Sequence, residues 1–357
     1  MRFRPRPNAL RKVRGEIVTL AGAAVGGCAL GLAQVPGGWL SGAMIGVAVF
    51  AAIGWAGPLS TPLRRLALTG SGVAIGSAMS PAMLKSLGAY PASLAFMAAA
   101  VAATTYVSAS MLRRIPGWSP QTAFFAAVPG ALSYVFLVAA RDEKADLPRI
   151  AVVQVCRVFF LMALIPLIVG ETTAATLPRT GPVDPPLLVL IDFVLGGLAG
   201  YFLERLNIAG GMLFGAMLVS GFLHATGIAP GRSPVAIVEA AQVLIGAWVG
   251  ARFIGFDWRL LARSATASLG SFIAGTAVSM LFAAAASFYL ALPFAQTMMA
   301  FSPGGLEAMT ILAFALGLDP LYVGAQHLAR FILISLTLPF ALRFWLMRTR
   351  KDAAPRP

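Results

Sequence analysis

Two matching stretches decide the fold, VPGALSYV at residues 128–135 and SPGGLEAMTILA at residues 302–313. Each carries a Pro-Gly step, Pro129-Gly130 or Pro303-Gly304, near the middle of a long apolar segment. Proline removes a backbone donor and glycine tolerates a positive φ, so such a step interrupts a helix. An arm of about ten helical residues rises about 15 Å, which reaches the middle of a bilayer and no further. The pattern predicts two hairpins whose tips meet near the centre of a membrane, with two kinked spanning helices as the alternative.

The composition around these stretches is that of a membrane protein. The chain has 357 residues, of which 59% are hydrophobic and 11% charged, with a mean hydropathy of +0.83, whereas soluble domains carry about 25% charge. The net charge of +14 lies on short segments between apolar runs, which disfavours a nucleic-acid-binding domain. Cys28 and Cys156 are too few for a disulfide framework or a thiolate metal site.

A hydropathy window of about 19 residues predicts twelve apolar segments. They cover residues 17–34, 39–57, 64–81, 89–112, 119–140, 150–170, 186–205, 210–228, 235–253, 264–290, 293–317 and 321–345. We expect this organisation: a basic cytoplasmic tail at 1–16, a first membrane repeat at 17–170, a linker at 171–185, a second repeat at 186–346 and a basic cytoplasmic tail at 347–357.

The two halves of the chain match in sequence. PGGWLSGAMIG at 36–46 pairs with AGGMLFGAMLV at 209–219, and GVAIG at 72–76 pairs with QVLIG at 242–246. The two Pro-Gly stretches follow in the same order, as do Arg157 with Pro166 and Arg330 with Pro339. Matches that keep their order along both halves predict a tandem duplication of about 173 residues.

The lysine and arginine distribution predicts how the halves are oriented. If all twelve segments cross and the N-terminus is inside, 17 basic residues lie inside and 8 outside; if the two Pro-Gly segments enter and leave on one side, 22 lie inside and 3 outside. The positive-inside rule prefers the second arrangement. Each half then has five spanning helices and one broken or re-entrant helix, and the odd number of crossings inverts the second half. We expect an all-α protein of the bacterial inner membrane with both termini in the cytoplasm.

Interrupted helices at membrane depth must have their free backbone groups buried in protein or lining a wet cavity, and secondary transporters bind substrates there. The helices that begin after each break would point their positive ends at this site. The candidate substrate or ion site consists of Pro129, Gly130, Ser133, Gln154, Arg157, Pro303, Gly304, Gly305, Glu307, His327 and Arg330.

Ionisable residues inside apolar segments carry most of the expected chemistry. Glu307 is the carboxylate next to a break, and we expect it to exchange a proton or help to hold sodium; a structural partner within the hairpin arm is the alternative. Arg330 is expected to neutralise Glu307, and Arg157 to bind a substrate carboxylate through its guanidinium fork. The alternative for both arginines is that they bind the carbonyls of the broken helices.

Three residues before these arginines lie Gln154 and His327, on the same helix faces. His327 is a candidate proton relay, with a hydrogen-bonded packing role as the alternative. For His224, Asp192 and Glu239 we expect structural or interfacial roles. Repeated GxxxG spacing indicates tight helix packing.

The GAM element after Gly-Gly, the paired Pro-Gly segments and SPGGLEAMTILA followed by HLAR resemble the bacterial AbrB-type duplicated membrane protein family, whose labels include ammonia monooxygenase-like protein and AbrB regulator. The resemblance covers about residues 17–345. It implies a relationship to bile-acid symporter and cation/proton antiporter folds, in which inverted repeats place two broken helices at the membrane centre. By this resemblance, the core motif of the site consists of Pro129, Gly130, Pro303, Gly304 and Glu307. The first half departs from the motif, because it has Ala131 in place of the second glycine and Ser133 in place of the acid.

A secondary transporter is therefore the expected function, moving a small and anionic metabolite with protons or sodium. The alternative is a membrane sensor that affects gene expression indirectly. We expect no enzyme activity and no cofactor, since a copper monooxygenase needs several histidines and this chain has two. The expected partners are the lipid bilayer, a small-molecule substrate and a coupling ion, with a homodimer as a possibility and no nucleic acid, because the tails are too short for a DNA-binding module.

Overall fold

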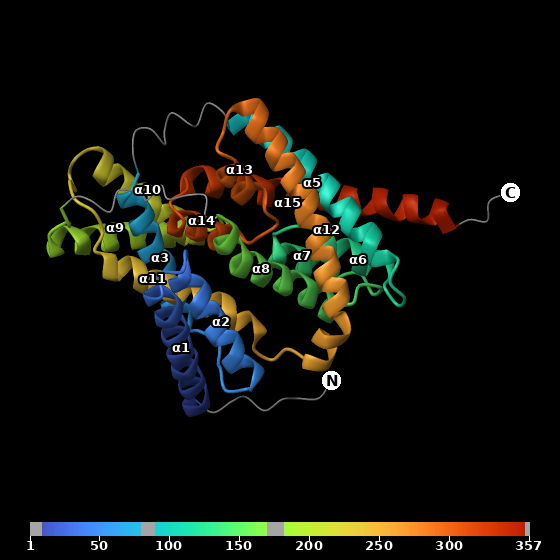
Figure 1. Ribbon diagram of the computed structural model, residues 1–357, viewed down its shortest axis with the longest axis horizontal. Coiled ribbons are helices and arrows are strands. Elements are labelled where there is room, and N and C mark those ends of the chain that lie inside the picture. The colour runs from blue at the N-terminus through green and yellow to red at the C-terminus, as the bar shows by residue number, and fades with distance from the viewer. Residues whose placement is uncertain (1–8, 80–89, 170–181, 354–357) are drawn as a thin grey trace. The chain divides into compact units, whose positions relative to one another are not determined.

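The computed structural model describes residues 9–79, 90–169 and 182–353, and in these residues it confirms an all-α fold (Figure 1). Extended pairing within them is limited to an isolated bridge between Val183 and Arg232. The helices are α1 (Ala9–Leu32), α2 (Gly38–Ala52), α3 (Thr61–Ser77), α5 (Tyr90–Arg113), α6 (Pro120–Ala127), α7 (Leu132–Ala139), α8 (Leu147–Val169), α9 (Pro186–Arg205), α10 (Gly211–Ala225), α11 (Val235–Gly250), the 3-10 turn η2 (Ala251–Phe253), α12 (Trp258–Leu290), α13 (Phe294–Phe301), α14 (Leu306–Ala315) and α15 (Pro320–Ala353).

Seven helices of the described part of the chain are long and apolar enough to cross a membrane. The qualifying stretches are Lys12–Leu32, Pro91–Arg113, Leu147–Val169, Pro186–Arg205, Val235–Phe253, Trp258–Leu290 and Pro320–Thr349. Together with the composition, they make this chain a multi-pass membrane protein. Helix α1 begins inside the segment expected as the tail 1–16, and most of the expected linker 171–185 lies outside the described residues.

The helices form two compact units, and each unit takes helices from both halves of the sequence. The first unit contains α1, α2, α3, α9, α10, α11 and η2, with the end of α8 from Met162 and the end of α14 from Phe314. The second contains α5, α6, α7, α8 up to Leu161, α12, α13, α14 up to Ala313 and α15. Both Pro-Gly steps therefore belong to the second unit.

Glycine-lined contacts hold the first unit together, and they join one half of the sequence to the other. A Cβ atom on Gly246 of α11 would lie 2.4 Å from the Leu40 carbonyl oxygen of α2, and one on Gly72 of α3 would lie 2.5 Å from the Leu213 carbonyl oxygen of α10. Only glycine permits such close backbone approach. Thus α2 packs on α11, and α10 packs on α3.

These contacts are compatible with the predicted duplication and change its register at one place. Gly246 and Gly250 meet the Leu40 and Met44 carbonyls of α2 in the way that Gly72 and Gly76 meet the Leu213 and Met217 carbonyls of α10. The spacing equates the segment 72–76 with 246–250, whereas sequence matching paired it with 242–246. The sequence match followed the shared Val and Ile-Gly letters, which shifted the register by one helical turn.

The duplicated Gly-Gly steps have a clear backbone reason. Gly37 and Gly210 precede α2 and α10 with φ values of 63° and 71°, the left-handed region that favours glycine. The glycine that follows each of them, Gly38 or Gly211, lies against the backbone of the preceding helix, where a Cβ atom would be 2.5 Å from the Leu30 oxygen or 2.6 Å from the Glu204 nitrogen. Each step thus reverses the chain tightly.

In the second unit, the first Pro-Gly segment folds back on itself. The Ser119 hydroxyl, just before α6, donates to the Lys144 carbonyl after α7 over 2.6 Å, and the Asp146 amide donates to the Thr122 hydroxyl over 2.9 Å. A straight path through both arms would carry the chain about 30 Å away from Ser119. The chain instead enters and leaves at the same level, which is the predicted hairpin.

The helix that follows this hairpin confirms the reversal. Gln154 of α8 donates to the Phe125 carbonyl over 2.8 Å, and Arg157 donates to the Val128 carbonyl over 2.8 Å. Later residues of α8 meet later residues of α6, so the two helices run in the same direction. Since α8 starts again beside the start of α6, α7 must lead the chain back.

The second hairpin has the same construction. His327 of α15 contacts the Met299 carbonyl of α13 at 3.3 Å, and Arg330 donates to the Ser302 carbonyl over 2.7 Å. Here too the following helix runs parallel to the first arm, so α14 is the returning arm. Both Pro-Gly segments are therefore hairpins, and the kinked spanning helix is excluded as a description of either.

A matched pair of glycines in α9 tests the packing of the first unit. A Cβ atom on Gly200 would lie 2.7 Å from the Met212 oxygen, whereas one on Gly197 would meet nothing closer than Thr69 Cγ2 at 3.7 Å. Gly200→Ala should lower stability by about 1–3 kcal/mol through overpacking, and Gly197→Ala should not. Thermal unfolding in detergent measures both, and equal transition temperatures would contradict this packing.

The hairpin geometry predicts where two exposed positions are accessible. In a Cys28→Ser background, Arg114→Cys before α6 and Lys144→Cys after α7 should react with a membrane-impermeant maleimide from the same side of oriented vesicles. Permeabilised vesicles provide the control for complete labelling. Reaction from opposite sides would mean that the segment crosses.

Candidate functional site

The tips of the two hairpins lie next to each other inside the second unit. A Cβ atom on Gly130 would lie 3.3 Å from Nε and Nη2 of Arg330 and 3.5 Å from the Gly304 carbonyl oxygen. Gly130 has a φ of 82°, so any larger residue there would be strained as well as crowded. The two tips therefore meet inside this unit.

The first arm of each hairpin ends at the residue before proline. Val128 has φ −54° and ψ 124°, and Ser302 has φ −52° and ψ 135°. This extended conformation is the one that a following proline imposes, here Pro129 or Pro303. The last carbonyls of both first arms are left without helical partners, so they need donors from elsewhere.

Arg157 supplies donors to the first hairpin. Its guanidinium lies 3% exposed and donates from Nη1 to the Ala127 carbonyl over 3.1 Å and from Nη2 to the Val128 carbonyl over 2.8 Å. The Nη1 group also reaches the Ala126 carbonyl at 3.5 Å. Its Nε has no hydrogen-bond partner among the described residues. The positive charge is thus placed at the negative end of α6, which the helix dipole favours.

Arg330 does the same for the second hairpin. It is 3% exposed, and it donates to the carbonyls of Ser302 over 2.7 Å and Gly304 over 2.5 Å. Its Nη2 also lies 2.5 Å from Nδ1 of His327. Guanidinium nitrogens only donate, so Nδ1 accepts and the ring proton sits on Nε2, which faces the Met299 carbonyl at 3.3 Å. His327 is neutral in this arrangement and orients Arg330.

Gln154 makes at the first hairpin a contact like the one that His327 makes at the second. Its amide donates to the Phe125 carbonyl, as the His327 ring does to the Met299 carbonyl. The two residues differ toward the arginine, because a hydrogen bond joins His327 to Arg330 whereas Arg157 keeps an unpaired Nε. Both arginines therefore bind hairpin carbonyls, the geometry of the alternative considered for them.

Glu307 stands in the first turn of α14, half-buried, near the positive end of that helix. No hydrogen bond or ion pair to it is found among the described residues, and the expected pairing with Arg330 is absent there. Beside it, a Cβ atom on Gly305 would meet nothing within 4 Å. This carboxylate therefore lies two residues from a position with open space around it.

The two tips are not equivalent. Ala131 begins α7 with a φ of 53°, a conformation that is strained for a residue with a Cβ atom, whereas Gly305 has no positive φ. Ser133 lies in the first turn of α7, where the second half has Glu307. The carboxylate at the tips therefore belongs to the second hairpin.

One residue of this site was not predicted from the sequence. Ser279, in the middle of α12, is 2% exposed and donates to the Phe301 carbonyl at 2.5 Å, which gives the end of α13 a further donor. The available signal was a small polar residue inside an apolar helix, but the segment 264–290 contains several of these and nothing in the sequence distinguishes Ser279 among them.

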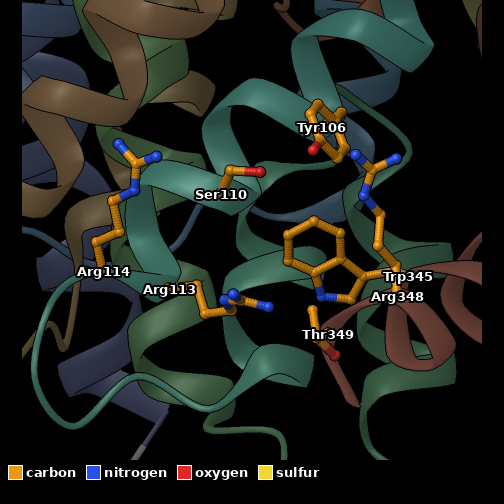
Figure 2. A pocket seen from close by; sticks show the side chains of 7 residues that line it. All are labelled: Tyr106, Ser110, Arg113, Arg114, Trp345, Arg348 and Thr349. Atoms are coloured by element: carbon orange, nitrogen blue, oxygen red, sulfur yellow. The ribbon is translucent and has the colours of Figure 1, made fainter. Parts of the chain in front are cut away.

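A separate cavity of about 130 Å³ lies between the C-terminal parts of α5 and α15 (Figure 2). Arg348 lies over the Tyr106 ring at 4.9 Å, and Arg113 lies over the Trp345 ring at 6.0 Å. Its lining comprises Tyr106, Ser110, Arg113, Arg114, Trp345, Arg348 and Thr349. It contains none of the predicted site residues.

Removing one guanidinium tests its role at the tips. Arg157→Met keeps much of the side-chain volume but leaves the Val128 and Ala127 carbonyls without a donor, at about 1–3 kcal/mol for each unsatisfied group. We expect a clearly lower unfolding temperature in detergent, with Arg157→Lys in between. The exposed Arg114→Met is the control. If Arg157→Met lowers the unfolding temperature as little as Arg114→Met does, Arg157 does not stabilise the hairpin.

Comparison with known proteins places the chain in a family. No curated protein matches the chain. The family model described as transition state regulatory protein AbrB matches residues 39–346, which include both hairpins and, in the first unit, α3, α9, α10, α11 and all of α2 but its first residue. The match covers most of the chain, and the chain belongs to the AbrB family of membrane proteins.

Proposed function

We propose that this protein is a secondary transporter of a small anionic metabolite, driven by protons or sodium, with its site at the two hairpin tips. The observation that carries the proposal is the pair of interrupted helices whose ends meet, with Gly130 against Arg330 and the Gly304 carbonyl. Irregular backbone at membrane depth is tolerated where it is buried or lines a substrate cavity. In secondary transporters, such paired breaks form the binding site.

The charges at the tips support an anionic substrate. Arg157 and Arg330 bring two buried guanidinium groups to the tips, and Glu307 brings one carboxylate. The helix α7, which begins at Leu132, has no acidic residue in its first turn. A helix start of this kind favours an anion, and the unpaired Nε of Arg157 is a donor that a carboxylate could use.

Glu307 is the group we propose for ion coupling. It is half-buried, has no described partner and stands beside the open space at Gly305. A carboxylate in this position can bind a proton or contribute oxygen ligands to sodium. With the substrate anion neutralised by the arginines and the coupling cation held by Glu307, both would bind without a large net charge deep in the bilayer.

A membrane sensor is the second candidate. It is favoured by the description of the family as a transition state regulatory protein. A sensor would bind the same class of ligand at the hairpin tips without moving it across the membrane, and it would act on gene expression through a partner. As a transporter or as a sensor, the protein would lie in the cytoplasmic membrane with both termini inside.

Reconstitution into proteoliposomes tests the transport proposal. With an imposed pH or sodium gradient, the wild-type protein should accumulate at least one of a panel of radiolabelled small mono- and dicarboxylates. Glu307→Gln keeps the shape of the side chain but removes its titratable charge, and it should abolish the pH-dependent part of the uptake.

The exposed Glu143→Gln serves as the matched control, because it also removes one carboxylate and should transport like the wild type. Unchanged uptake by Glu307→Gln would exclude this residue from coupling. Saturable binding of a carboxylate, measured by calorimetry, without any gradient-driven uptake would favour the sensor.

A further inference from the structure

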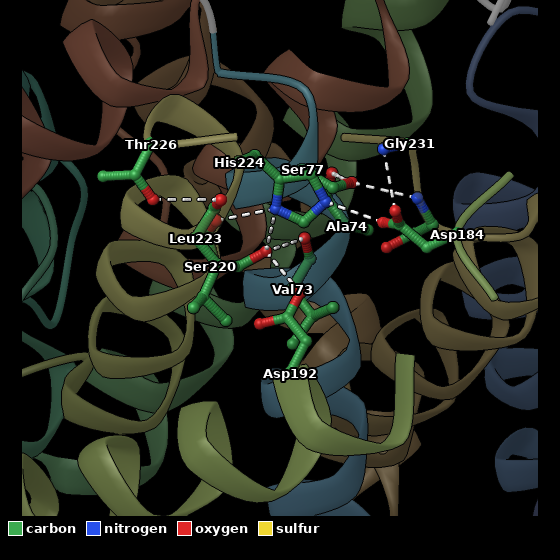
Figure 3. Close-up of polar contacts among 11 residues, drawn as sticks. Val73, Ala74, Ser77, Asp184, Asp192, Ser220, Leu223, His224, Thr226 and Gly231 are labelled. Carbon is green, nitrogen blue, oxygen red and sulfur yellow. Dashed lines mark hydrogen bonds and ion pairs between the residues drawn. The ribbon is translucent and has the colours of Figure 1, made fainter. Parts of the chain in front are cut away.

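Four buried polar side chains form a connected cluster in the first unit, apart from the hairpin residues (Figure 3). They are Asp184 before α9, Asp192 on α9, and Ser220 and His224 on α10. Asp192 is 3% and Ser220 0% exposed, and the His224 and Asp184 side chains are 6% and 3% exposed. Purely structural or interfacial roles were expected for Asp192 and His224, and their hydrogen bonds point to more.

The contacts of His224 fix where its protons are. Its Nδ1 lies 2.7 Å from the Ser220 carbonyl oxygen, which only accepts, so Nδ1 carries a proton. Its Nε2 lies 2.9 Å from Oδ2 of Asp184, whose other oxygen accepts from the Gly231 amide over 2.7 Å. The short contact needs one proton, on the ring or on the carboxyl. The pair therefore holds that proton and has no net charge.

The contacts of Ser220 require a second proton. Its hydroxyl oxygen lies 2.9 Å from the Val73 carbonyl oxygen of α3 and 2.7 Å from Oδ2 of Asp192. A hydroxyl has one proton to donate, and the carbonyl has none. When Ser220 gives its proton to the Val73 carbonyl, the 2.7 Å contact with Asp192 is a hydrogen bond only if Asp192 is a carboxylic acid that donates to Ser220.

The second oxygen of Asp192 agrees with this assignment. Oδ1 is buried and has no hydrogen-bond partner among the described residues. An ionised carboxylate without partners in the interior of a membrane protein is strongly unfavourable, whereas the carbonyl oxygen of a neutral acid tolerates it far better. The charged groups facing Asp192 are His224 and Asp184, and Arg232 belongs to the loop whose carbonyl binds the Asp184 amide. The buried stretch of α3, residues 67–76, contains no charged residue.

We propose that Asp192, Ser220, His224 and Asp184 form a buried proton-binding site, with Asp192 as the member that is protonated and can be ionised. Uptake forms the O–H bond of Asp192 from a solvent proton, and release breaks it and returns that proton to water. On release, the Ser220 hydroxyl must turn from the Val73 carbonyl to the carboxylate. Occupancy by the proton thereby controls the hydrogen bond between α10 and α3.

Infrared spectroscopy of the purified full-length protein in nanodiscs tests the site and needs no transport assay, so its outcome is independent of the proposed function. At neutral pH the wild type should show the carbonyl stretch of a buried carboxylic acid, which shifts in D₂O. Asp192→Asn, which preserves the hydrogen bond to Ser220, should lose this band, and the exposed Glu143→Gln should keep it. Glu307 and Asp184 can contribute carboxylic-acid bands to both proteins, so the deciding quantity is the difference spectrum, and a difference between wild type and Asp192→Asn without this band overturns the proposal.

Two further measurements complete the test. Ser220→Ala removes the acceptor of the Asp192 proton, so the band should move to higher frequency as its hydrogen bond weakens; an unmoved band would contradict the assignment even if Asp192→Asn did not fold. Adding NaCl at fixed pH, with choline chloride as the control for ionic strength, should leave the band in place. Its loss with sodium alone would identify a sodium site and overturn the proton site.

Discussion

A chain that stops halfway through a bilayer must satisfy its backbone polar groups from within the protein, and this constraint explains the arrangement of the second unit. Each Pro-Gly step ends a helix inside the second unit and leaves carbonyls without helical partners. Arg157 and Arg330 come from the helices that follow the hairpins, and each places a guanidinium on those carbonyls. A buried arginine would be very costly by itself, and bare carbonyls would be costly as well; each makes the other acceptable.

Both hairpins have an arginine bound to their carbonyls, but the residues around the two arginines differ. Gln154 and His327 bind equivalent carbonyls, but the hydrogen bond to the neighbouring arginine is found at His327. In the second half, Glu307 stands in the first turn after the break, where the first half has Ser133. One tip is thus mainly backbone and the other carries a carboxylate, an asymmetry that suits the proposed binding of an anion and a cation by different hairpins.

The sequence was sufficient to predict the order of the helices, both breaks and the equivalence of Arg157 with Arg330, because hydropathy, Pro-Gly steps and spacing within a duplication are local signals. It did not reveal that each compact unit would mix helices from both halves, since the same glycine spacing fits several partners. The cluster of Asp192 and His224 was also missed. Its third member, Asp184, lies in a segment expected to be a linker, and hydrogen-bond geometry, which composition does not contain, is what connects the four residues.

In the first unit, helices of the first half of the sequence pack on helices of the second half, and this affects the order in which the protein assembles. During synthesis α2 enters the membrane early, but the glycine face of its partner α11 emerges from the ribosome only about 200 residues later. Until then α2 packs on α1, while the faces of α2 and α3 that will contact α11 and α10 have no partner. Assembly of this unit therefore completes late in translation, and a protein truncated after the first half would expose these surfaces to the quality-control proteases of the membrane.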